Sequence, residues 1–350
     1  MAWKKKLLTL TDGTQVSAQA PEIVSASRST DIPAFYADWF FERLKIGYSA
    51  WANPFNGVKS YISYKDTRFI VFWSKNPHPL IKHLEELKDL NIKCYIQYSL
   101  NDYEKEGLEK GVPPISFRID TFRKLVDILG LGGVVWRFDP LVLTDKITID
   151  DLLYKVEKVG NALKGYTQKL VFSFADIAIY KKVRRNLMNE HINYCEWTED
   201  QMRYFATELV KLNSSWKYQL GTCAEKLDLP GVKHNKCIDD ELIIKRAWKD
   251  KKLMDLLNVE IKNRQNDLFG STEEVPESAV TIDHSHYAIR KKNNKDKGQR
   301  QFCGCIISKD IGQYNTCPHL CEYCYANTSK DAALRNYKSH KDNPNKETII

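Results

Sequence analysis

The chain has 350 residues, a formal net charge of +8 and a hydrophobic content of 43%. This length suits one large domain or two ordinary ones, and the apolar content is ordinary for a globular protein. No apolar run is long enough to span a membrane and no signal-cleavage pattern follows Met1, so we expect a cytoplasmic protein without a membrane partner.

The positive excess is concentrated in two stretches, residues 245–252 and 290–300. A solvated basic face explains such stretches. A nucleic-acid partner is the alternative, which the charge permits without requiring it.

The first elements in chain order are a hairpin around Asp12 and Gly13 and a short apolar run at residues 22–27. Asp31 then fits the N-cap of a helix with Pro33 in its first turn. That helix is expected to end at Gly47.

The pattern of an apolar run followed by an amphipathic helix then repeats along the chain. Further strands are predicted at residues 48–51, 69–73, 94–98, 134–136, 170–174 and 218–221. Helices are predicted at residues 79–90, 115–129 and 149–163, and from the capping box that begins at Thr198. Strand–helix alternation indicates an α/β fold with a mainly parallel sheet.

Seven or eight such units predict a (β/α) barrel, complete or nearly so, of the TIM type. A doubly wound open sheet is the alternative. Within this scheme residues 1–238 form the barrel core, and 239–300 form a basic insertion, partly helical to about 263 and partly flexible. Residues 301–335 form a cysteine-rich segment that closes the barrel beside its first strand. Residues 336–350 form a polar tail.

Polar side chains follow the predicted strands, where barrel enzymes place their chemistry. Arginine forks suit carboxylates, and Asn or Gln suits adenine edges. The predicted catalytic residues are Arg28, Lys75, Arg137 and Asp139. The predicted cofactor-binding residues are Asn53, Asn76, Gln97 and, in the cysteine-rich segment, Tyr323. For each residue alone, a helix cap, a turn or a salt bridge explains its position equally well.

Three cysteines near the C-terminus, Cys317, Cys321 and Cys324, are spaced as C-x3-C-x2-C. Thiolates are soft ligands, and three of them can hold a 4Fe–4S cluster while one iron stays open. Two other interpretations are structural zinc, with His319 or His340 as fourth ligand, and disulfide bonds.

Six further cysteines are present. Cys94 lies within an apolar run, and Cys195 has no partner signature. The other four are predicted to hold a second, fully ligated auxiliary iron–sulfur cluster, with zinc or no shared site as alternatives: Cys223, Cys237, Cys303 and Cys305.

The triad spacing and the Tyr-Cys-Tyr-Ala run at 323–326 resemble the cluster loop of radical S-adenosylmethionine (SAM) enzymes. The resemblance implies that SAM binds the open iron and is cleaved reductively to a 5′-deoxyadenosyl radical, which takes a hydrogen from an unknown substrate. It also implies an electron donor such as flavodoxin or ferredoxin. Members of that superfamily usually carry this loop near the N-terminus, whereas here it comes last.

Several stretches together resemble a bacterial and archaeal family catalogued as domain of unknown function 1848. They are residues 25–33, 72–77, 98–102, 135–140, 223–226 and 317–327. The resemblance implies a radical-SAM-like barrel with a C-terminal cluster motif, and it brings no established substrate. The competing functions are a zinc-binding regulatory protein with nucleic-acid affinity and a radical enzyme that acts on nucleic acid.

Overall fold

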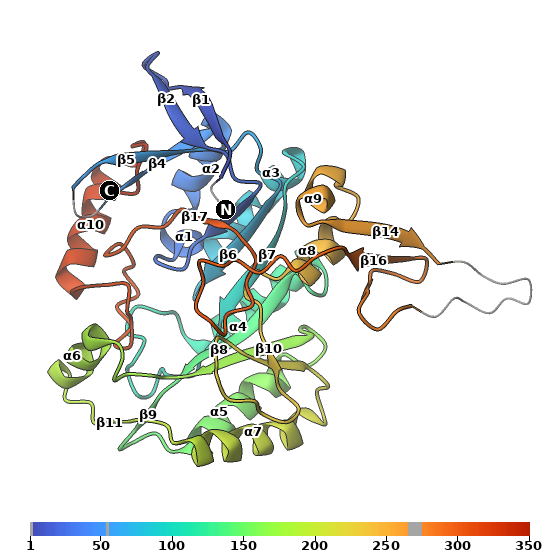
Figure 1. The fold of residues 1–350 in the computed structure, drawn as a ribbon. Helices are drawn as coiled ribbons and strands as arrows, with labels where there is room; N and C mark the ends of the chain where they lie inside the picture. Colours follow the sequence, from blue (N-terminus) through green and yellow to red (C-terminus); the bar gives the residue numbers. More distant parts are fainter. Residues whose placement is uncertain (1–2, 54–55, 265–274) are drawn as a thin grey trace, which may run out of the picture.

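The computed structural model describes residues 3–53, 56–264 and 275–350. It shows a mixed α/β fold built around one eight-stranded sheet in which all neighbouring strands are parallel (Figure 1). In order across the sheet the strands are β13 (Lys233–His234), β12 (Gln219–Thr222), β10 (Lys169–Phe174), β8 (Val134–Leu141), β7 (Lys93–Ser99), β6 (Phe69–Ser74), β3 (Ile23–Ala26) and β17 (Lys309–Asp310).

The predicted closed barrel is wrong. Strands β13 and β17 form the two edges of the sheet, and no strand ladder joins them in the described residues. From β3 to β13 the strand order follows the chain order, without the reversal of order found in doubly wound folds. Alternating strands and helices produce the same sequence pattern in a closed barrel and in an open sheet, because closure of the sheet depends on its edge strands alone.

The sheet is buried on both faces because its strands alternate between two hydrophobic cores. One core contains Val24, Ile70 and Phe72 and is covered by helices α2 (Ala37–Ile46), α3 (Leu84–Asp89), α4 (Ile115–Leu129), α5 (Ile149–Ala162) and α7 (Glu199–Asn213). The other contains Phe69 and Val71 and is covered by α8 (Asp240–Ala247) and α9 (Lys251–Leu256). Continuous apolar runs suit strands that are covered on both sides.

Several predicted helix ends are confirmed. Asp31 caps α1 (Ile32–Phe35) by accepting a hydrogen bond from the Ala34 backbone, and Gly47 ends α2 in the left-handed conformation. Gly130 ends α4, and Thr198 and Gln201 form the capping box of α7. The helix predicted at 79–90 is a 3-10 helix, η1 (His78–His83), followed by α3.

Three smaller sheets surround the large one. The predicted N-terminal hairpin is confirmed and belongs to a four-stranded sheet of β1 (Lys5–Thr9), β2 (Gln15–Gln19), β5 (Lys59–Ser63) and β4 (Tyr48–Ala52). The run at 48–51 is therefore a strand, but it lies outside the large sheet. The other two sheets are β9 (Leu143–Thr144) with β11 (Tyr194–Cys195), and β14 (Val259–Asn263) with β16 (His286–Arg290) and β15 (Val280–Thr281).

The C-terminal third differs from its prediction. The long helix expected from 239 to about 263 is divided into α8, α9 and β14, because Asp250 starts α9 as a new N-cap. Part of the segment predicted as flexible, residues 265–274, lies outside the described residues. The tail predicted from 336 overlaps α10 (Lys330–Asp342), which Ser329 caps. Among the described helices, none combines the length and hydropathy of a membrane-spanning segment.

The edge strand β17 brings the end of the chain beside its beginning. Lys309 pairs with Val24 and Asp310 with Ser25. The Asp310 carboxylate accepts hydrogen bonds from the Ser25 hydroxyl at 2.9 Å, the Ser27 hydroxyl at 2.7 Å and the Arg28 backbone at 2.8 Å. The cysteine loop that follows β17 therefore starts at the carboxyl end of β3.

We expect Asp310→Ala to lower the free energy of unfolding by about 2 kcal/mol or more, because several partly buried donors lose their acceptor. Asp127→Ala, an exposed substitution on α4, is the control and should change it by less than about 0.5 kcal/mol. Urea denaturation followed by circular dichroism measures both. Equal midpoints for the two variants would show that Asp310 does not hold this edge of the sheet.

Candidate metal and cofactor site

The triad cysteines lie in the loop between β17 and α10. All three are free thiols; Cys321 is buried, and Cys317 and Cys324 are partly buried. The loop is closed by hydrogen bonds from the Cys324 backbone to the Cys321 carbonyl at 3.1 Å and from the Asn327 amide to the Cys317 carbonyl at 2.9 Å. These bonds fold the motif into a compact turn that carries three sulfur atoms.

The protein around these sulfurs is buried and polar. Burial raises the pKa of Cys317, Cys321 and Cys324, while the ammonium of Lys75 opposes this rise at Cys321 and Cys324. Backbone amides of Ala326 and Asn327 also donate to the Cys324 thiol. A buried thiolate needs such donors or a bound metal, and a metal-bound thiol is deprotonated.

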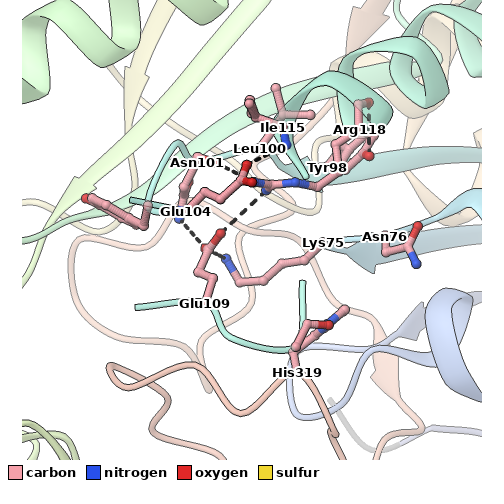
Figure 2. A network of polar contacts seen from close by, with 12 residues as sticks. Lys75, Asn76, Tyr98, Leu100, Asn101, Glu104, Glu109, Ile115, Arg118 and His319 are labelled. Carbon is pink, nitrogen blue, oxygen red and sulfur yellow. Dashed lines mark hydrogen bonds and ion pairs between the residues drawn. The ribbon is translucent and has the colours of Figure 1, made fainter. Parts of the chain in front are cut away.

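Lys75, at the end of β6, points toward Glu109 (Figure 2). Its ammonium lies 2.7 Å from a Glu109 carboxylate oxygen and 2.8 Å from the Tyr323 hydroxyl. The Tyr323 hydroxyl donates to the same Glu109 oxygen, and the Asn101 amide donates to it at 3.1 Å and to Tyr323 at 3.0 Å. This network ties the ends of β6 and β7 to the residue that precedes Cys324.

Glu109 carries the negative charge of the network. Arg118 of α4, which is 1% exposed, lies 3.5 Å from its second carboxylate oxygen and donates to the Asn101 carbonyl at 2.8 Å. Burial raises the pKa of Glu109, but Lys75 and Arg118 outweigh this effect and the net shift is downward. The carboxylate is therefore ionised between two cations in a water-poor interior.

His319 lies inside the triad, and both of its ring nitrogens face oxygen atoms. Nε2 is 2.8 Å from the Asp31 carboxylate and Nδ1 is 3.0 Å from the Gly111 carbonyl. Asp31 also accepts from the Ser74 hydroxyl at 2.7 Å and from the Lys75 backbone at 2.7 Å. This histidine therefore joins the cysteine loop to the ends of β3 and β6, and neither nitrogen is free for a metal.

Gly111 makes this close approach possible. A Cβ atom at residue 111 would lie 2.7 Å from the Pro318 carbonyl oxygen and 2.8 Å from that of His319. The backbone of Gly111 in turn donates to the His319 carbonyl at 3.0 Å. Two loops that are about 200 residues apart in the chain are thus packed backbone against backbone.

The four other predicted metal ligands also come together. Cys223 follows β12, Cys237 precedes α8, and Cys303 and Cys305 precede β17. The sulfurs of Cys223 and Cys237 are 3.3 Å apart, and the Cys237 backbone donates to the Cys305 sulfur at 3.2 Å. A hydrogen bond from Cys223 lowers the pKa of Cys237, and one from Cys305 lowers the pKa of Cys303 to about 6. We call this set the cysteine quartet.

Arg137 lies between the quartet and the network of Lys75. One of its nitrogens is 3.1 Å from the Cys237 sulfur and 3.2 Å from the Gln97 amide oxygen, and the other donates to Asp139. Burial lowers the pKa of Arg137, but the charges of Cys237 and Asp139 outweigh it and the pKa is raised. The Asp139 backbone donates to Asn101 at 2.9 Å, so the two sites are connected.

The remaining predicted residues are distributed unevenly. Gln97 faces the quartet, where its amide donates to the Cys237 carbonyl at 2.8 Å. Arg28 follows β3, and one of its terminal nitrogens is buried without a partner, as is the side-chain oxygen of Asn76. Asn53 follows β4, which belongs to the four-stranded sheet, so it does not follow a strand of the large sheet.

Two central residues, Glu109 and Arg118, were not among the predicted site residues. Glu109 lies in the charged segment 104–110, which resembles a solvated loop, and Arg118 lies within a helix. Most of the predicted residues lie at or just past the end of a predicted strand, and neither Glu109 nor Arg118 has such a position. Burial of an acidic residue in a charged segment has no signature in a single sequence.

No three or more His, Cys, Asp or Glu side chains are arranged as ligands of one metal ion anywhere in segments 3–53, 56–264 and 275–350. In an iron–sulfur cluster each thiolate binds a different iron, so the sulfurs need not converge on one point.

Tyr323→Phe removes the hydroxyl that joins Glu109, Lys75 and Asn101. We expect the free energy of unfolding of the metal-free protein to fall by about 1–3 kcal/mol, because buried donors are left unpaired. Tyr325→Phe is the matched control on the other side of Cys324; Tyr325 is 44% exposed, and its hydroxyl donates to the Arg28 carbonyl at 2.9 Å. Chemical denaturation compares them, and equal losses would contradict the special role of Tyr323.

The Glu190 carboxylate forms ion pairs with Lys110 at 2.6 Å and with Lys330 at 2.5 Å, and these two lysines flank the cysteine loop. Hydrogen bonds from these lysines lower the pKa of Glu190 from 4.5 to about 2. A carboxylate whose pKa is lower in the folded than in the unfolded state stabilises the protein at pH values above its unfolded-state pKa. This stabilisation is lost as the pH falls through the folded-state pKa. The melting temperature of Glu190→Gln should therefore be below that of the parent at pH 7 and approach it near pH 2. A difference independent of pH would refute this assignment.

Comparisons with known proteins place these features in a family. The model of the family described as "Domain of unknown function (DUF1848)" matches residues 23–326, from the first strand of the large sheet to the end of the cysteine triad. No curated protein and no solved structure matches the chain significantly. The chain therefore belongs to the DUF1848 family.

Proposed function

We propose that this protein is an iron–sulfur enzyme of the radical SAM type. The observation that carries the proposal is the position of the triad loop, which the network of Lys75, Glu109 and Tyr323 holds at the carboxyl ends of β6 and β7. In parallel α/β sheets, ligands bind at the carboxyl ends of the strands.

The triad suits a 4Fe–4S cluster with one open iron. Cys317, Cys321 and Cys324 would each hold one iron, and the open iron would bind the amino and carboxylate groups of SAM. When bound and reduced, this cluster supplies one electron to SAM, the bond between sulfur and the 5′ carbon breaks, and methionine is released with a 5′-deoxyadenosyl radical that takes a hydrogen atom from the substrate.

Residues of this chain would support that chemistry in three ways. Lys75 places a positive charge beside Cys321 and Cys324, which offsets the negative charge of a thiolate-bound cluster. Asn76 has a buried side-chain oxygen without a partner, which can accept a hydrogen bond from the iron-bound amino group of SAM or from an adenine amine. Tyr323 and Glu109 are buried and exclude water from one side of the loop.

The zinc alternative receives less support. A structural zinc ion prefers four protein ligands, and His319, the histidine within the triad, has both ring nitrogens engaged by oxygen atoms. The basic stretch 290–300, which would bind nucleic acid in that alternative, is partly neutralised, because Arg290 pairs with Asp240 at 2.6 Å and Lys291 with Glu260 at 3.2 Å.

The test compares Cys321→Ala with Cys195→Ala, a substitution at an exposed free cysteine on β11. Both proteins are reconstituted anaerobically with iron and sulfide, reduced with dithionite and given SAM. We expect 5′-deoxyadenosine from the parent and from Cys195→Ala, and only background from Cys321→Ala. Equal 5′-deoxyadenosine production by the two variants would exclude the triad as the site of SAM cleavage.

A further inference from the structure

The cysteine quartet contacts one terminal nitrogen of Arg137, whose other terminal nitrogen donates to Asp139. Its members come from three separate segments, and Cys237, Cys303 and Cys305 are each at most 6% exposed. All four are free thiols. Buried free cysteines usually act as small apolar residues and then face apolar neighbours. These four belong to or pack against the second hydrophobic core, and they also face one another and a set of hydrogen-bond donors.

Several N–H donors are directed at the quartet sulfurs. The sulfur of Cys237 accepts from Arg137 at 3.1 Å and from the Asn235 amide at 3.3 Å. The sulfur of Cys305 accepts from the Cys237 backbone at 3.2 Å and from the Ile238 backbone at 3.4 Å. N–H donors around sulfur atoms tune and stabilise metal-bound thiolates, whereas neutral thiols are weak acceptors and gain little from them.

Two arginines give this region a positive charge. The guanidinium carbons of Arg28 and Arg137 each lie 5.2 Å from the centre of the Trp73 ring. The Arg28 backbone donates to Asp310 at 2.8 Å, and one of its terminal nitrogens is buried without a partner. Buried cations need compensating anions, and a cluster bound by four thiolates is an anion.

Asn235 supplies an independent observation. It is 4% exposed, its amide nitrogen donates to Cys237, and its side-chain oxygen is buried without a partner. The hydrogen bond to the Cys237 thiol thus orients Asn235 and leaves its side-chain oxygen without a partner. Unpaired buried polar atoms of this kind are typical of groups that surround a binding site.

We propose that Cys223, Cys237, Cys303 and Cys305 hold an iron–sulfur cluster of their own, separate from the triad. Four protein thiolates leave no open iron, so this cluster transfers electrons or stabilises the fold and does not bind SAM. Zinc bound by the same four thiolates is the alternative, and a metal count separates it from a cluster. The two sulfurs at 3.3 Å must separate when the cluster binds.

The quartet also joins three parts of the chain that the fold must bring together. Cys223 directly follows β12 of the sheet, Cys237 lies before α8, and Cys303 and Cys305 lie in the segment before β17. The Ile306 backbone donates to the Ile238 carbonyl at 3.1 Å, which keeps two of these segments side by side. A cluster here would fix the course of the chain toward β17 and the triad.

The test counts iron and acid-labile sulfide in anaerobically reconstituted protein. The parent should contain about eight irons per chain, that is, two 4Fe–4S clusters. A variant with Cys317→Ala, Cys321→Ala and Cys324→Ala should retain about half of the iron and a visible cluster absorption. A variant with Cys237→Ala and Cys305→Ala should lose about half while it keeps the triad cluster. Iron retained in the triad variant tests the quartet whether or not the protein cleaves SAM.

Three results would overturn the proposal. They are an iron-free triad variant, one zinc ion per chain bound by the quartet, and a Cys223–Cys237 disulfide in protein purified without oxygen, detected by mass spectrometry of peptides. If the quartet variant does not fold, the triad variant still decides the matter, because any cluster iron that it retains must be bound outside the triad. Cys223→Ser, at the least buried member, provides a milder variant for the same count.

Discussion

The parallel pairing of β17 with β3 is the constraint on which the candidate site depends. It joins residues 309–310 to residues 24–25, and the Asp310 carboxylate secures the junction through hydroxyl and backbone donors of the β3 end. Without this pairing, a cysteine motif that comes last in the chain could not meet residues that follow β3, β6 and β7. A cysteine motif of this spacing is usually expected after a first strand, and the pairing places this one beside β3, the first strand of the large sheet.

Charge balance in a buried space is the second common feature of the site. Glu109 lies between Lys75 and Arg118 and is held in its ionised form, while Arg137 and Arg28 lie near the quartet. Ionised groups in a protein interior persist when opposite charges and hydrogen bonds compensate for lost hydration. Both thiol sites thus have positively charged side chains nearby that can compensate for negative charge. The two sites are connected through Arg137, Asp139 and Asn101.

Local signals in the sequence predicted local structure well, and they failed where the pairing of distant strands determines the fold. Asp31, Gly47 and Thr198 ended or started helices as expected, since caps depend on a few neighbouring residues. The closed barrel was wrong, because alternation does not reveal how two distant edge strands meet. The motif cysteines were visible from spacing, whereas Glu109 matters only through burial that the fold creates.

Electron paramagnetic resonance of the dithionite-reduced protein, recorded before and after addition of SAM, tests the central claim most directly. The measurement is best made on the parent and on a quartet-deficient form, so that any second cluster does not mask the signal. The account predicts a reduced 4Fe–4S signal that changes when SAM binds the open iron of the triad cluster. A protein that shows no cluster signal, or a signal that SAM leaves unchanged, would contradict the account.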